Sequence, residues 1–93
     1  MSLLLDVIQN EDTLSEKQKK ILIAIYNFSV PVSSRCIAKA LGIKDRQNVH
    51  QTLLILLERN FIIREKIRVF LYSVNQDKMK EMVENYKQIK FYT

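Results

Sequence analysis

The chain contains a single glycine, Gly42, and a single proline, Pro31. These two residue types make many tight turns, because glycine adopts left-handed backbone angles and proline fixes φ. A 93-residue chain with so few of them is poorly suited to a turn-rich all-β fold, and its 47% hydrophobic residues do not fit a disordered segment. The sequence therefore predicts one mostly α-helical domain over residues 1–93, since this length has room for a single core.

A helix is predicted over residues 15–29. Ser15 and Gln18 are three residues apart, the spacing of a capping box in which both side chains satisfy free backbone N–H groups. Apolar residues such as Ile21 and Ile25 then follow at helical spacing and give one buried stripe. We expect the helix to end before Pro31, because the residue before a proline avoids helical angles.

Two further helices are predicted on either side of the glycine. Ser33 or Ser34 can cap the first, and Gly42 makes the left-handed turn after residue 41. Asp45 can cap the second, and Asn60 can end it in a left-handed conformation. The second half of this helix is apolar on nearly all sides, which predicts that it is packed between other elements.

Beyond residue 60 the pattern changes from helix to strand. Two β-branched, aromatic-rich runs, at residues 61–64 and 68–72, flank residues 65–67 and predict a β-hairpin. The fold class is thus mostly α with a small hairpin. We divide the domain into an N-terminal apolar helix within residues 1–12, capped by Ser2, a core and hairpin at 14–74, and a C-terminal helix at 75–93, capped by Asn75.

The two terminal helices are candidates for a dimer contact. The last one has apolar residues at steps of three, four and three, which is a short heptad seam suited to a symmetry mate. Packing on its own domain is the alternative, and the same choice applies to the first helix, which is too short to stand alone. The residues expected at the dimer contact are Leu4, Leu5, Ile8, Met79, Met82, Tyr86 and Ile89.

The positive charge is concentrated in the middle of the chain. Residues 33–72 hold eight basic and three acidic side chains, which accounts for the whole net charge of +5, because the other residues balance. A local excess of this kind indicates contact with a polyanion.

The order helix, helix, glycine turn, helix with a polar start, hairpin resembles the winged helix-turn-helix domain of MarR-type and PadR-type regulators over residues 14–74. The matching positions are Val32, Ser33, Ala38, Leu41, Gly42, Ile43, Val49, Leu53, Leu56 or Leu57, Asn60, Phe61 and Ile62. The chain departs from the pattern with one extra residue between Ile43 and Val49 and with Asn60 in place of glycine. The resemblance implies a tri-helical core with a wing, whose third helix enters the major groove of DNA while the hairpin reaches the backbone or the minor groove.

The residue types at these places suit that role. Arg, Gln and Asn side chains at a helix start can read base edges in bidentate fashion, and helix ends and cations hold phosphates. We expect base contacts from Arg46, Gln47, Asn48, His50 and Gln51, phosphate contacts from Ser33, Ser34, Arg35 and Lys44, and wing contacts from Arg64, Lys66 and Arg68. For the hairpin cations, a merely solvated surface is the alternative.

These features predict site-specific binding of double-stranded DNA by a homodimer at a palindromic site. The biological role would be transcription regulation, or operator or centromere (partition-site) binding for a plasmid or virus, and the low Gly and high Ile and Lys content fits an A/T-rich genome such as an archaeal one. The runner-up is a winged helix that binds another protein of a transcription or segregation complex.

Other functions find no support in the sequence. The one histidine, His50, and the one cysteine, Cys36, are too few for a zinc site and belong to no catalytic constellation, so we expect no enzyme, metal or cofactor. Cys36 is expected to be a small buried residue, with an intersubunit disulfide as the alternative. The longest apolar run, residues 53–57, is far below the about 20 residues of a membrane span, and no leader is recognisable, which predicts a cytoplasmic protein without membrane contact.

Overall fold

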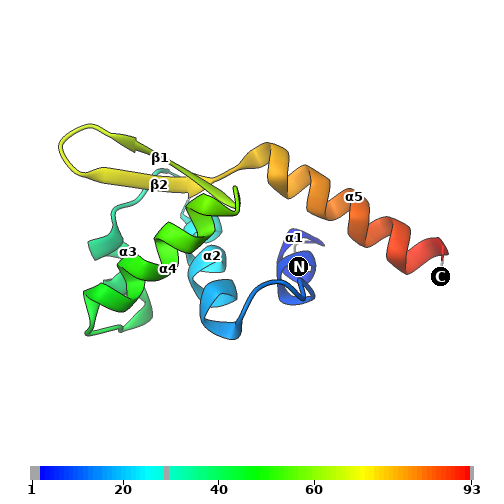
Figure 1. The fold of residues 1–93 in the computed structure, drawn as a ribbon, viewed down its shortest axis with the longest axis horizontal. Coiled ribbons are helices and arrows are strands. Elements are labelled where there is room, and N and C mark those ends of the chain that lie inside the picture. Colours follow the sequence, from blue (N-terminus) through cyan, green and yellow to red (C-terminus); the bar gives the residue numbers. More distant parts are fainter. Residues whose placement is uncertain (1–2, 29, 93) are drawn as a thin grey trace.

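The computed structural model of the chain describes residues 3–28 and 30–92, with side chains described up to residue 88. Within these ranges the fold is a small α+β domain of five helices and one antiparallel hairpin (Figure 1). The elements are α1 (Leu3–Gln9), α2 (Glu16–Asn27), α3 (Ser34–Leu41), α4 (Arg46–Glu58), β1 (Ile62–Lys66), β2 (Phe70–Val74) and α5 (Gln76–Tyr92). The predicted fold class, mostly helical with a small hairpin, is confirmed.

The helix starts follow the polar residues that were expected to cap them. Ser15 Oγ accepts the backbone N–H of Gln18 at 3.2 Å, and Gln18 Oε1 accepts that of Ser15 at 3.0 Å, which completes the capping box. The caps of the three later helices are Ser33 rather than Ser34, then Asp45, then Asn75. The proposed cap of the first helix, residue 2, lies outside the described residues.

The helix ends depend on two left-handed residues. Gly42 has a φ of 67° and Asn60 a φ of 65°, as the sequence predicted for both. Helix α2, in contrast, ends at Asn27, two residues earlier than expected, because the chain turns to extended angles at Phe28, whose half-buried ring packs against the core. The predicted end relied on Pro31 alone and ignored this contact.

The hairpin strands lie about two residues further along the chain than predicted. Ile62 pairs with Val74 and Lys66 with Phe70, so the connection is residues 67–69 instead of 65–67. The reason is burial: this register places Ile62, Tyr72 and Val74 together on the core face, and a slip of one residue would turn them to solvent. Backbone hydrogen bonds in both directions between Val32 and Tyr72 (2.9 and 2.7 Å) brace the other edge of β2.

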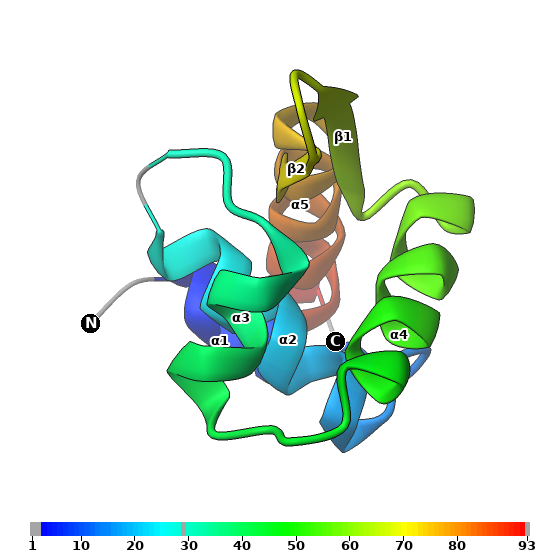
Figure 2. The ribbon, with the colours of Figure 1, turned by 90° about the vertical axis from the view of Figure 1, so that its left-hand side faces the viewer.

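The core is continuous across all elements. Its largest fully buried side chains come from α1 (Ile8), α2 (Ile21, Leu22, Ile25), α3 (Ile37), α4 (Val49, Leu53, Leu56) and the hairpin (Ile62, Tyr72). Helix α3 and helix α4 both pack on α2, which lies behind them, and β1 follows directly from α4. Figure 2 shows α3 and α4 flanking α2 below the hairpin. This core fixes the outward-facing sides of α3, α4 and the hairpin relative to one another.

Helices α1 and α5 complete the same core, which corrects the assignment of three residues to the dimer contact. Ile8, Met79 and Met82 are 0–4% exposed within the single chain, because α1 packs against α5 and α2. These three residues therefore pack on their own domain. Leu4 and Tyr86 are half-buried against this core, Leu5 is half-buried too, and the side chain of Ile89 lies outside the described part.

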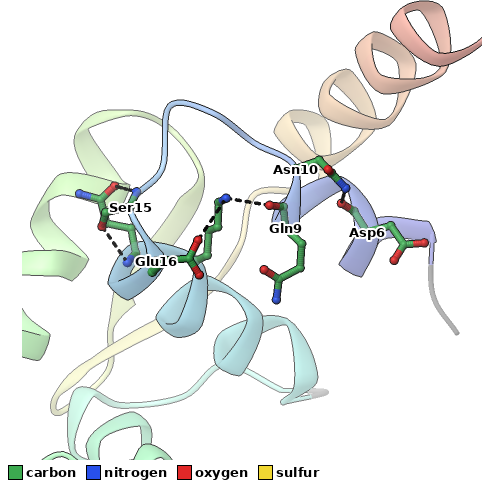
Figure 3. A network of polar contacts seen from close by, with 7 residues as sticks. Asp6, Gln9, Asn10, Ser15 and Glu16 are labelled. Carbon is green, nitrogen blue, oxygen red and sulfur yellow. Dashed lines mark hydrogen bonds and ion pairs between the residues drawn. The ribbon is translucent and has the colours of Figure 1, made fainter.

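Polar contacts fix α1 to α2. Lys19 Nζ donates to the carbonyl oxygen of Gln9 at 2.7 Å, at the C-terminal end of α1, and lies 3.7 Å from Glu16 Oε1 (Figure 3). A cation there neutralises the carbonyl groups that a helix end leaves without partners. Across the molecule, the guanidinium of Arg59 donates to the carbonyl oxygen of Thr13 at 2.6 Å and holds the α1–α2 connection against the end of α4.

Candidate nucleic-acid interface

The first two turns of α4 present a row of polar side chains to solvent. The exposed ones are Arg46, Gln47, His50 and Gln51. The opposite side of the helix is buried in the core through Val49, Leu53 and Leu56, so the helix cannot rotate without opening the core. The sequence prediction of an exposed polar helix start is therefore confirmed for these four residues.

Asn48 is the exception in this row. Its side chain is half-buried, and Nδ2 donates to Asp45 Oδ2 at 3.1 Å, while Asp45 Oδ1 accepts the backbone N–H of Gln47 at 3.0 Å. The amide of Asn48 thus completes the cap of α4. Asn48 is therefore a capping residue, and the candidates for base contacts are its exposed neighbours Arg46, Gln47, His50 and Gln51.

The exposed face of α4 continues to an apolar residue that the sequence analysis did not select. Leu54 is 44% exposed and follows His50 and Gln51 at steps of four and three, so it lies on the same face. The expectation that the second half of α4 is packed between other elements was wrong at this position. Helical spacing from Gln47 would have located it, and a leucine there offers an apolar contact of the kind that thymine methyl groups accept.

The N-terminal end of α3 lies at the same end of the molecule. Ser33 Oγ accepts the backbone N–H of Cys36 at 3.3 Å, Ser33 and Ser34 are half-buried, and Arg35 is exposed. Cys36 is exposed as well, so the expectation that it is buried was wrong. The buried residues of this helix are Ile37 and Ala38. Lys44 is exposed in the turn between α3 and α4.

The hairpin carries its three cations in two different places. Arg64 and Lys66 lie on one face of β1, where the guanidinium carbon of Arg64 is 4.3 Å and Lys66 Nζ 5.5 Å from the centre of the Phe70 ring. Arg68 lies in the connection, at the tip, between Ile67 and Val69. The two strand cations therefore hold the distal half of the hairpin together, while Arg68 extends beyond it.

These three segments share one end of the domain. The hairpin tip and the start of α4 both lie at the left of Figure 1, and both face the viewer in Figure 2, with α3 beside α4. The basic residues of this end include Arg35, Lys44, Arg46, Arg64, Lys66 and Arg68. The surface combines hydrogen-bonding groups on a helix with cations on a neighbouring hairpin.

A second feature is an open groove of about 920 Å³ along α2. Its apolar lining comes from Ile23 and Phe28 of the α2 region and from Leu41 and Ile43 at the end of α3, and lysines of α2 border it. No group of three or more His, Cys, Asp or Glu side chains that could hold a metal ion occurs among residues 3–28 and 30–92. Over the same ranges, every helix is too short or too polar to cross a membrane.

Neither a protein-family model nor a curated protein matches the chain. Solved structures of similar fold include two from other organisms. One is a protein of unknown function from Listeria innocua, with 25% sequence identity and a TM-score of 0.65 over 97% of this chain and 67% of that one. The other is a protein from the thermoacidophilic archaeon Sulfolobus tokodaii, with 19% identity and a TM-score of 0.70 over 94% of this chain and 91% of that one. The arrangement of helices and hairpin thus recurs in other proteins.

Proposed function

We propose that the chain is a winged helix-turn-helix protein that binds double-stranded DNA as a homodimer. In this proposal α3, the turn at Gly42 and α4 form the helix-turn-helix, and β1 and β2 form the wing. The observation that carries it is the exposed polar start of α4, which is backed by the core and lies at the same end of the domain as the cationic hairpin.

The proposed binding mode follows from the shape of DNA. The major groove admits one α-helix and presents each base pair as a distinct pattern of donors and acceptors. Arg46 and Gln47, together with His50 or Gln51, carry the groups that read such patterns, and all are exposed on one side of α4. They are the proposed base contacts.

The surrounding groups are proposed to hold the sugar-phosphate backbone. Arg35 lies in the first turn of α3 and Lys44 in the turn that precedes α4, and the start of α3 at Ser33 offers backbone N–H groups to a phosphate. Arg64, Lys66 and Arg68 would contact the backbone or the adjacent groove from the wing. Such contacts position the protein without reading sequence and make its affinity depend on salt.

The homodimer is proposed to form at the α1–α5 side, away from the DNA face. Ile8, Met79 and Met82 are buried within the single chain, so the dimer contact must come from other residues of this side. Leu3 is exposed there and Val83 is half-buried. A two-fold dimer would present two copies of α4 to half-sites about 34–36 Å apart, one helical turn of DNA. A transcription regulator or a partition-site protein would both use this arrangement.

Selection and a salt titration test the proposal. Duplexes bound by the chain are selected from a random pool and sequenced, and the affinity for the best one is measured at several salt concentrations. We expect log Kd to rise linearly with log salt concentration and Arg46→Ala to weaken the best site by about 1–3 kcal/mol while relaxing its base preference. Lys66→Ala should weaken all duplexes about equally and lower the salt slope by about 1. Absence of duplex binding refutes the proposal.

The groove along α2 favours one other function, a winged helix that binds a protein partner. Its apolar lining, bordered by Lys17 and Lys20, suits an amphipathic helix with acidic flanks. Protein binding replaces DNA binding as the proposed function if the selection recovers no duplex and the chain binds such a peptide. Charge reversal at Lys17 and Lys20 would then abolish peptide binding.

A further inference from the structure

The hairpin tip is built from residues that hairpin connections seldom contain. Tight connections favour Gly, Asn and Asp, yet residues 67–69 are Ile, Arg and Val. Ile67 is 67% and Val69 57% exposed, and neither belongs to the core. Two β-branched apolar side chains are therefore held in water on either side of Arg68, at the point where the hairpin extends furthest from its buried base.

The tip is held in place by the strands and not by the core. From Ile63 to Phe70 the hairpin is exposed, and only its base, at Ile62, Tyr72 and Val74, is buried. Cross-strand pairing of Lys66 with Phe70, together with the stacking of Arg64 on the same ring, stabilises the exposed part. The result is a narrow ribbon with an apolar end and cationic sides.

We propose that this tip is a wedge: Ile67 and Val69 insert between stacked bases from the minor groove and kink the duplex. The inference rests on the proposed function, which places the wing at the DNA. Architectural DNA-binding proteins use apolar side chains in this way, and the kinks range over about 20–90°. Here Arg68, between the two wedge residues, would enter the negatively charged minor groove and guide them.

Side-chain chemistry and DNA mechanics both suit the wedge. Val and Ile have few χ1 rotamers, so fixing them between bases costs little entropy, and insertion removes apolar surface that is exposed in the free protein. Unstacking costs a few kcal/mol per step and costs least at flexible pyrimidine–purine steps such as TA. The wedge therefore adds a preference for such a step at a position where no base edge is read.

The test measures binding and bending on the same molecules. Dye-labelled fragments of equal length carry the selected site at different positions along the DNA, so that the gel mobility of each complex reports the bend and anisotropy reports binding. The full chain is compared with the double variant Ile67→Ser/Val69→Ser and with the matched control Ile63→Ser. Ile63 is 52% exposed on the same hairpin but lies near its base.

We expect the wild-type chain and Ile63→Ser to kink the duplex by at least about 20°, and the double variant to leave it as straight as free DNA. The affinity of the double variant should change by less than about tenfold, because lost burial and avoided unstacking offset each other. Its salt slope should be unchanged, since no charge is removed.

Three results would overturn the wedge and leave the proposed function intact. The first is straight DNA in the wild-type complex, and the second is DNA bent as strongly by the double variant as by the wild type. The third is DNA that Ile63→Ser also fails to bend. A double variant that changes the sedimentation of the free protein but not the bend would show that the tip joins two copies, which also overturns it. Loss of all salt-dependent duplex binding in the wild type, seen first in the anisotropy, refutes the proposed function itself.

Discussion

The cap of α4 determines whether the proposed recognition helix begins where its polar side chains need it. Asp45 accepts the Gln47 backbone N–H at 3.0 Å and the Asn48 side-chain amide at 3.1 Å, so Asp45→Ala removes both bonds. Loss of an N-cap costs about 1 kcal/mol, and the exposed second bond adds about 0.5 kcal/mol. For a domain of this size, about 1.5 kcal/mol lowers Tm by about 6–12 °C.

Thermal unfolding followed by circular dichroism measures this loss, and Asp45→Asn is the control. Asparagine caps helices about as well as aspartate, so the control should unfold within about 2–3 °C of the wild type. Because the control also removes a negative charge from the proposed DNA face, it should bind duplex DNA at least as tightly. An Asp45→Ala variant as stable as the wild type, or a control as unstable as Asp45→Ala, would refute this account of the cap.

Three further predictions concern the fold. Met82→Ala should lower the free energy of unfolding in urea by about 2–5 kcal/mol, because Met82 is buried within the chain; a loss that appears only in the dimer dissociation constant would contradict this. Gly42→Ala should cost about 1–2 kcal/mol through backbone strain alone, since a Cβ there meets no atom within 4 Å, and an unchanged urea midpoint would show that the turn is not strained. Lys19→Met should speed hydrogen exchange in α1 more than in α4 by removing the bond to the Gln9 carbonyl; equal effects would contradict a local role.

Local chemistry made most of the helices predictable. A cap such as Ser15 or Asp45 acts on backbone groups two or three residues away. Gly42 adopts left-handed angles because glycine has no Cβ, and Asn60 does so because its short polar side chain tolerates them. Information of that range is present in a single sequence. The exposed start of α4 was predictable for the same reason, because apolar spacing fixes which side of a helix is buried.

The errors arose where distant contacts decide. The run from Val69 to Tyr72 is apolar throughout, so period-two alternation could not choose the strand register, and the packing of Tyr72 beside Val32 chose it. The heptad spacing of apolar residues in α5 suits packing against a partner chain as well as packing against α1. Only the fold shows that α1 packs there. Leu54 is exposed because no other element in the described part of the chain packs over it, and that depends on the arrangement of distant segments.

Mapping the DNA contact by NMR tests the central claim most directly. The backbone amides of the uniformly ¹⁵N-labelled chain are assigned and followed while a selected duplex is added. The account predicts that shifts and line broadening concentrate at residues 33–36, 44–51, 54 and 64–70, with little change along α2. Perturbations that instead follow the α2 groove, at Ile23 and Phe28, while the start of α4 stays unchanged, would contradict it.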